Sequence, residues 1–152
     1  MIMRYGFTTG SCAAAASKAA AYMLLTGKAK NKITIQTPKG IAYTADITDI
    51  KRSENEVSCA VIKDGGDDPD VTTGAYIYAS VRILHYDTCA LSKKKQDLVI
   101  INIDGGDGVG RVTKPGLDQP VGNAAINHVP REMIEKEVRA VSYTHLTLPT
   151  IL

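Results

Sequence analysis

Four aspartates stand together in one short loop, the stretch "KDGGDDPDVTTGA" at residues 63–75. Carboxylates this close repel one another, so we weigh four uses for them: a metal ion, a cationic group such as a sulfonium or an ammonium, helix capping, and plain solvation. The spacing lacks the ligand ladder of an EF-hand. The histidines and cysteines form no ligand pair either, so the sequence predicts no metal site. The four residues are Asp64, Asp67, Asp68 and Asp70.

A second loop, "GGDGVGRVTKPG" at residues 105–116, combines glycines with two cations, Arg111 and Lys114. It matches neither a Walker loop nor the glycine turn of a dinucleotide-binding fold. Paired glycines let backbone N–H groups approach a ligand that a Cβ would keep away. We therefore expect contact with an anionic or flat ligand, while a wide hairpin loop is the structural alternative. The glycines are Gly105, Gly106, Gly108, Gly110 and Gly116.

The stretch "TTGSC" at residues 8–12 offers hydroxyls and free amide groups at the start of a predicted helix. Such a start can bind a carboxylate or a phosphate. Ordinary capping is the alternative, and spacing alone favours it, because every helix needs a cap and few bind ligands.

The elements that must position these loops are read from periodicity. Alanine dominates residues 8–27, which predicts one helix that ends at Gly27. Alternating apolar residues predict a hairpin of strands 31–38 and 40–51, followed by a strand at 56–63. The Tyr, Ile and Val content of residues 74–86 favours a strand, and a run of apolar residues before the second glycine loop predicts another at 97–103. A final helix is predicted at residues 130–141. The predicted class is α+β: a mixed, mostly antiparallel sheet packed with an Ala-rich N-terminal helix and a few short helices.

The bulk composition limits the classes of partner that the chain is expected to bind. The chain has 152 residues and a net charge of +2, from 18 basic and 16 acidic residues, which argues against nucleic acid as a partner. The longest apolar stretch, residues 19–25, is too short to span a bilayer, and the N-terminus is unlike a signal peptide. We expect a cytoplasmic protein with no membrane contact. Cys12, Cys59 and Cys89 are far apart and are expected to be reduced, mostly structural thiols.

The last residues have a different character. Residues 142–152, "SYTHLTLPTIL", lack charge and resemble foreign read-through of the kind that sequencing adaptors leave. We therefore expect one domain at residues 1–141, followed by a tail that was not selected with it and packs poorly.

Three stretches together resemble a known family. "RYGFTTGSCAAAASKAA", "KDGGDDPDVTTGA" and "GGDGVGRVTKPGLDQPVGNAAINHVPREMI" look like the N-terminal part of the cobalt-precorrin-5B (C1)-methyltransferases, the CbiD family. The resemblance spans about residues 4–141, and because family chains are much longer it implies a truncated member. It implies transfer of a methyl group from S-adenosylmethionine to C1 of cobalt-precorrin-5B, which gives cobalt-precorrin-6A in anaerobic cobalamin biosynthesis. Cobalt would enter only as part of the corrinoid substrate, and other enzymes of the pathway are possible contacts.

The resemblance also implies roles for individual residues. The corrinoid carries acetate and propionate side chains, which cations and a helix start could hold. The methyl donor is a sulfonium, which carboxylates and glycine backbone could face. No catalytic side chain is identified, since methyl transfer needs mainly in-line positioning. The expected substrate-binding residues are Thr8, Thr9, Gly10, Ser11, Arg111, Lys114 and Arg131, and the expected donor-binding residues are Asp64, Gly65, Gly66, Asp67, Asp68, Gly106, Gly108 and Gly110.

Two other classes of function stay open at this point. A small-molecule kinase-like, phosphate-binding domain would use the Gly-Ser helix start, although no ATP loop is visible. A non-catalytic corrinoid-binding module is the other, because the chain resembles only part of the family.

Overall fold

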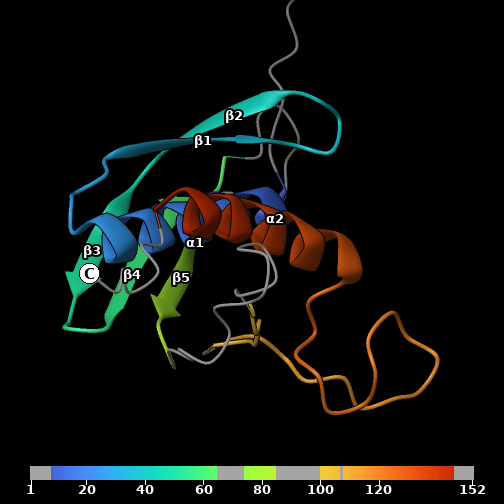
Figure 1. The fold of residues 1–152 in the computed structure, drawn as a ribbon. Helices are drawn as coiled ribbons and strands as arrows, with labels where there is room; N and C mark the ends of the chain where they lie inside the picture. Colours follow the sequence, from blue (N-terminus) through green and yellow to red (C-terminus); the bar gives the residue numbers. More distant parts are fainter. Residues whose placement is uncertain (1–7, 65–73, 85–99, 107, 146–152) are drawn as a thin grey trace, which may run out of the picture.

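The computed structural model describes residues 8–64, 74–84, 100–106 and 108–145. The described residues form two helices and five strands (Figure 1). The strands make two separate antiparallel sheets, β1-β2 and β3-β4-β5. The α+β class is therefore confirmed. In chain order the elements are α1 (Thr9–Thr26), β1 (Lys32–Gln36), β2 (Ala42–Asp46), β3 (Thr48–Arg52), β4 (Glu56–Ile62), β5 (Tyr76–Arg82) and α2 (His128–His145).

Helix α1 is the centre of the fold and has the predicted ends. The Thr8 hydroxyl accepts a hydrogen bond from Ser11 N at 3.1 Å, and Gly27 takes a left-handed φ of 73° while its N–H bonds to Met23 O. Buried residues lie all round the helix, which a helix shows when other elements cover it on several sides. Alanine suits this place because its small side chain lets the strands and α2 come close.

The predicted hairpin around residues 38–40 is confirmed as β1 and β2, paired from Lys32 opposite Asp46 to Gln36 opposite Ala42. Both strands alternate exposed and buried residues. The buried face joins the core around α1 through Ile33, Ile35, Tyr43 and Ala45.

The prediction of one strand at residues 40–51 is wrong. Two strands occupy this stretch, because β2 pairs with β1 whereas β3 pairs with β4 in the other sheet. The chain changes sheets at Ile47, which is buried and whose N–H donates to Asn31 O at 2.8 Å. The alternation of apolar residues continues through this crossing, so it cannot indicate which strand is the hydrogen-bond partner.

The sheet β3-β4-β5 covers another side of α1. The predicted strand at 56–63 is confirmed as β4, and the one predicted at 74–86 is confirmed as β5 over Tyr76–Arg82; residues 83 and 84 form no strand, and residues 85 and 86 lie outside the described residues. The two strands pair antiparallel from Glu56 opposite Arg82 to Ile62 opposite Tyr76. One face of these two strands joins the core, through the residues Val57, Cys59, Val61, Ile77, Ala79 and Val81.

The strand predicted at residues 97–103 is wrong over its described part. Residues 97–99 lie outside the described residues, and residues 100–106 form no strand. Ile101 and Ile103 are half-buried against the core, and Asn102 between them is exposed. What is missing, within the described residues, is a neighbouring strand to share hydrogen bonds with.

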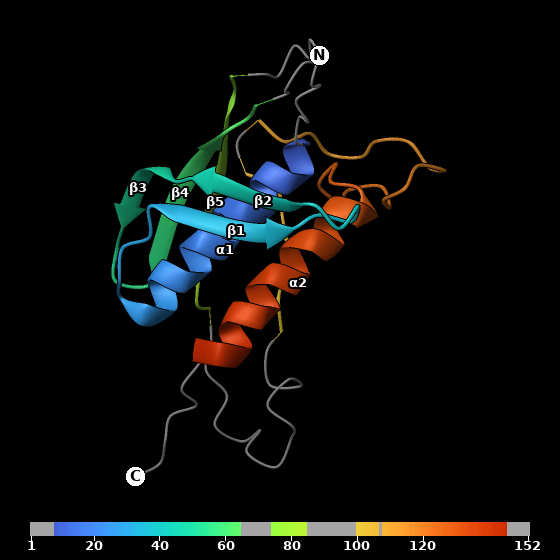
Figure 2. The same ribbon diagram turned by 90° about the horizontal axis from the view of Figure 1, so that it is seen from above.

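Helix α2 confirms the predicted helix at 130–141 and extends it to His128–His145. It lies beside α1, and the two helices begin at the same end of the molecule (Figure 2). Ser142 is buried and its hydroxyl donates to Val138 O at 2.8 Å. The predicted boundary between a domain and a tail at residue 142 stays a prediction; residues 146–152 lie outside the described residues.

Candidate functional site

The starts of α1 and α2 touch at one end of the molecule. A Cβ built on Gly10 would lie only 3.1 Å from Pro130 Cγ, so glycine permits the close approach of the two first turns. Each helix start carries N–H groups without a partner inside the helix and the positive end of the helix dipole. The fold thus gathers two such ends, and each already has one acceptor: the Thr8 hydroxyl at α1 and the Asp118 carboxylate at α2.

The hydroxyl groups at the start of α1 differ in their hydrogen bonds and in their exposure. Thr8 Oγ1 serves the cap, since it lies 3.1 Å from both Ser11 N and Ser11 Oγ. Ser11 itself is buried, whereas Thr8 and Thr9 are exposed. Capping is therefore confirmed, and the predicted role of Thr8, Thr9, Gly10 and Ser11 in binding substrate stays a prediction.

Arg131, in the first turn of α2, is held by backbone carbonyl groups. Its guanidinium donates to Ile126 O at 2.6 Å, Ala124 O at 2.9 Å and Ile103 O at 3.3 Å. These bonds tie residues on both sides of the glycine loop to α2. The geometry gives Arg131 a positioning role, and its predicted contact with a substrate carboxylate stays untested.

Arg111 is paired with a carboxylate in the same loop. Its two terminal nitrogens donate to Asp104 at 2.6 and 3.2 Å, and both side chains are exposed. The hydrogen bond from Arg111 lowers the pKa of Asp104 below its usual range. Lys114 is exposed on the same loop. An incoming carboxylate could therefore exchange with Asp104 on Arg111 or bind at Lys114.

The glycines of this loop differ in the space around them. Gly105 is crowded, but Gly106, Gly108 and Gly110 have no atom of the described residues within 4 Å of the position where a Cβ would stand. Gly108 also has a φ of 84°, a conformation that other residues rarely adopt. The backbone at these three glycines is open to a ligand, as the donor-binding prediction requires.

Asp118 and His128 form a pair that the sequence analysis missed. Asp118 Oδ2 accepts from His128 N at 2.8 Å, and Asp118 Oδ1 contacts His128 Nδ1 directly. The bond from Asp118 raises the pKa of His128, while bonds from Gln119 and then His128 lower the pKa of Asp118. The carboxylate thus caps α2 and fixes the imidazole. Residues ten apart across an irregular loop carry no periodic signal that could have revealed the contact.

Only the base of the acidic loop is described. Its ends meet through Gly74 N–H to Lys63 O at 2.8 Å and Lys63 N–H to Ala75 O at 2.9 Å. Asp64 is exposed. Burial is the main cause that raises the pKa of the Cys12 thiol in the first turn of α1, and the charge of Asp64 is a lesser cause, so the base of the loop lies within electrostatic reach of that turn. The predicted donor-binding residues Gly65, Gly66, Asp67 and Asp68, together with Asp70, lie outside the described residues.

The thiol of Cys12 is part of the core beneath this end. Its Sγ lies 3.6 Å from Tyr43 Oη, and burial is the main cause that raises the pKa of both groups. Burial likewise raises the pKa of Cys59 to about 11. Neither thiol is poised as a nucleophile. Over the described ranges, no three histidine, cysteine or acidic side chains are grouped to hold a metal ion.

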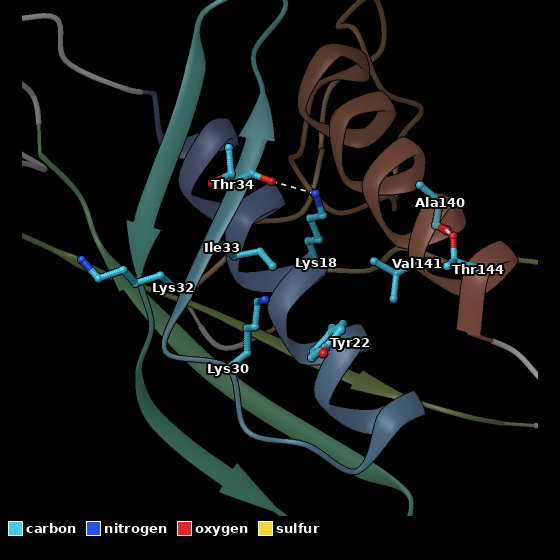
Figure 3. A pocket seen from close by; sticks show the side chains of 9 residues that line it. All are labelled: Lys18, Tyr22, Lys30, Lys32, Ile33, Thr34, Ala140, Val141 and Thr144. Carbon is cyan, nitrogen blue, oxygen red and sulfur yellow. Dashed lines mark hydrogen bonds between the residues drawn. The ribbon is translucent and has the colours of Figure 1, made fainter.

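A groove of about 460 Å³ lies elsewhere, between β1, the middle of α1 and the last turns of α2 (Figure 3). Three lysines line it, and each has a partner. Lys18 donates to Thr34 O at 2.7 Å and pairs with Glu137 at 3.2 Å. Lys30 lies 4.9 Å from the centre of the Tyr22 ring, and Lys32 pairs with Asp46 at 3.3 Å. The groove therefore offers less positive charge than its lysines suggest. The remaining lining residues are Ile33, Ala140, Val141 and Thr144.

Comparison with known proteins matches the chain to one family. The CbiD family model covers residues 1–149. The chain is 52% identical over 139 residues to the cobalt-precorrin-5B C(1)-methyltransferase of Alkaliphilus metalliredigens, with 91% of this chain and 34% of that protein covered. It is 49% identical over 139 residues to the protein of the same name from Thermoanaerobacter sp., with 91% and 35% covered. No solved structure gives a significant match.

The described fold is an α+β domain that gathers two helix starts and a glycine loop at one end. With the match over nearly its whole length, the chain belongs to the CbiD family. It spans about a third of the length of the curated relatives that it matches. None of the helices among the described residues has the length and apolar character needed to cross a membrane.

Proposed function

We propose that this chain forms the N-terminal part of an enzyme that methylates C1 of cobalt-precorrin-5B, with S-adenosylmethionine as donor and cobalt-precorrin-6A as product. The observation that carries the proposal is the family match, together with relatives of that printed name at about half identity over most of the chain. The reaction belongs to the anaerobic route to cobalamin, in a cytoplasmic setting. The cobalt ion is part of the substrate.

The end of the molecule where α1 and α2 begin suits a substrate rich in carboxylates. Two helix starts meet at Gly10 and Pro130, and Arg111 and Lys114 lie exposed on the loop that leads into α2. Each cation could make a charge-assisted hydrogen bond to an acetate or propionate group. Arg131 would act on the substrate only indirectly, because its bonds to three carbonyl oxygens position the loop that carries Arg111 and Lys114.

The methyl donor is proposed to bind between the acidic loop and the open glycines. A sulfonium is a cation, so Asp64 and the aspartates that follow it would stabilise it, and ribose hydroxyls could bond to the same carboxylates. Gly106, Gly108 and Gly110 leave the backbone accessible to a ligand. The donor supplies an activated methyl group, so the protein has mainly to hold donor and ring in line and exclude water.

Binding measurements with single variants test this division of labour. Arg111→Ala or Lys114→Ala should weaken a corrinoid with free carboxylates by about 1.5–3 kcal/mol, or roughly ten- to a hundredfold, and leave S-adenosylmethionine binding almost unchanged. Asp67→Asn and Asp68→Asn should do the reverse. Lys51→Ala is the matched control, because Lys51 is also an exposed cation. It lies on β3 beside Arg52, which bonds to Met23 O near the end of α1, whereas the proposed site is at the start of that helix.

Calorimetric titration of each variant with each ligand gives the answer. Equal loss of both ligands in both sets of variants would remove the separate roles. Aspartate variants that unfold would make the acidic loop a structural element of caps and turns.

A further inference from the structure

Residues 110–125 fold back on themselves as a narrow hairpin loop. Val112 N–H donates to Asn123 O at 2.9 Å, and Val112 O accepts from Gly122 N–H at 2.8 Å. The loop, orange in Figure 1, extends beyond the body of the fold and then returns to the start of α2. Its tip is the segment 113–121, which lies outside these paired limbs.

The tip gains little from the core of the protein. Residues 113–118 are all exposed, and the apolar side chains of Leu117 and Val121 have 62% and 56% of their surfaces exposed. A segment with few buried contacts opens at a low cost in free energy. Polar contacts must therefore provide most of what holds the tip in one position.

Asp118 joins the tip to the first residue of α2. Its Oδ2 accepts from His128 N–H at 2.8 Å, and its Oδ1 contacts Nδ1 of the same histidine directly. Within the tip, Gln119 Nε2 donates to Asp118 Oδ2 at 2.9 Å. The start of α2 is itself fixed, because Arg131 in its first turn bonds to three carbonyl oxygens. The contact of Asp118 with His128 therefore sets where the tip lies relative to α2.

We propose that Asp118 and His128 are positioning residues, which hold the loop tip so that Lys114 binds a substrate carboxylate. This inference rests on the proposed function, in which Lys114 and Arg111 bind acetate or propionate groups. Lys114 is exposed on the same tip as Asp118. Arg111 has its own partner in Asp104 and depends less on the contact. A mobile tip would hold Lys114 in the binding position for only a fraction of the time, and the affinity would fall by that fraction.

The contact responds to pH through the imidazole. The hydrogen bond from Asp118 is the main cause that raises the pKa of His128, and the charge of Glu132 is a lesser cause. The first turn of α1, which contacts Pro130, carries no acidic residue. Both partners are charged between the lowered pKa of Asp118 and the raised pKa of His128, and a charge-assisted hydrogen bond is about twice as strong as a neutral one. As the pH rises through the pKa of His128, the tip should become more mobile and the substrate should bind less tightly.

NMR order parameters of the tip amides test the positioning role on the complete 152-residue chain without a ligand. For Gly116 and Leu117 we expect values near about 0.85 below the pKa of His128, falling toward about 0.6 above it. Asp118→Ala should give the lower values at every pH, and His128→Gln should remove the pH dependence. His145→Gln, at the other end of α2, is the matched control and should titrate like the parent chain.

Calorimetric titration with cobyrinic acid, a corrinoid with free carboxylates, measures the consequence for binding. Over about pH 6 to 8.5, neither Lys114 nor the carboxylates change charge. The parent chain and His145→Gln should lose about two- to tenfold in affinity as His128 is deprotonated, the effect of weakening one exposed hydrogen bond. Asp118→Ala should show that loss already at low pH. Adding Asp118→Ala to Lys114→Ala should cause no further loss, because the contact acts through that lysine.

Each outcome decides the proposal. Order parameters that change neither with the titration of His128 nor in Asp118→Ala would overturn the positioning role. A pH-dependent affinity that persists in Lys114→Ala would also overturn it, because His128 would then act without the lysine. A tip that responds as expected, in a chain that binds no cobyrinic acid, would contradict the corrinoid site and with it the role of Lys114. A tip that does not respond, in a chain that binds the corrinoid, would overturn the positioning role alone.

Discussion

Gly105 is the glycine of the second loop that the fold can least replace. A Cβ there would lie 2.6 Å from Val109 Cγ1, 2.8 Å from Val109 Cβ and 3.0 Å from Ala124 Cβ. Ala124 is 1% exposed, and Val109 Cβ is attached to the backbone, so no side-chain rotation can remove the clash. Gly105→Ala should therefore destabilise the chain by about 1–3 kcal/mol, the usual cost of overpacking. At about 2–4 °C per kcal/mol, the melting temperature should fall by roughly 2–12 °C.

Gly106→Ala is the matched control one residue away. Among the described residues nothing stands within 4 Å of its Cβ position, and it has no left-handed φ. The variant should therefore equal the parent or gain up to about 1 kcal/mol from a less flexible unfolded chain. Urea unfolding followed by circular dichroism measures both. Adding Val109→Ala to Gly105→Ala removes the shortest contact and should restore part of the loss. Equal stability of Gly105→Ala and Gly106→Ala would contradict the close packing of Gly105 against Val109 and Ala124.

Three further variants test other contacts of the fold. Thr8→Ala removes the α1 cap on Ser11 N and should cost about 1 kcal/mol by urea unfolding. Asp118→Asn should bring the pKa of His128 down toward its ordinary value in an NMR titration, and an unchanged pKa would contradict the pairing. Because the folded pKa of His128 is raised, the stability that the pair adds is lost as the pH rises through that pKa; because the folded pKa of Asp118 is lowered, it is also lost as the pH falls through that lower pKa, so it is present between the two. Lys18→Met should lower the free energy of unfolding by about 1.5–3 kcal/mol, since it leaves the buried Glu137 without its cation. Replacing both Lys18 and Glu137 by methionine should lower it less. An equal loss in the single and the double variant would contradict this pairing.

The parts of the fold with local causes could be predicted from the sequence. Helix α1 runs over Thr9–Thr26 between the caps Thr8 and Gly27, close to the expected ends, because a cap and a left-handed glycine act within a few residues. The hairpin β1–β2 followed from alternation and its turn. The division of residues 40–51 between two sheets could not be foreseen, since alternation reports which face is buried and gives no partner strand.

The predicted site residues stay a prediction, and the structure adds where several of them lie. The first turns of α1 and α2 meet, with Gly10 against Pro130. The sequence could not show that Arg131 would bond to three carbonyl oxygens, because backbone acceptors leave no mark in the residue types. Nor could it show the contact of Asp118 with His128, since that contact depends on how an irregular loop lies against the start of α2.

One measurement tests the proposed activity most directly. Residues 1–141 of this chain would replace the matching stretch of the Alkaliphilus metalliredigens relative, to which the chain is 52% identical. The hybrid, checked by circular dichroism against the parent enzyme, is incubated with cobalt-precorrin-5B and S-adenosylmethionine carrying a ¹³C-labelled methyl group. We expect the label at C1 of the corrinoid, detected by mass spectrometry and NMR. A folded hybrid that leaves the corrinoid unlabelled while the parent methylates it would contradict the proposed function.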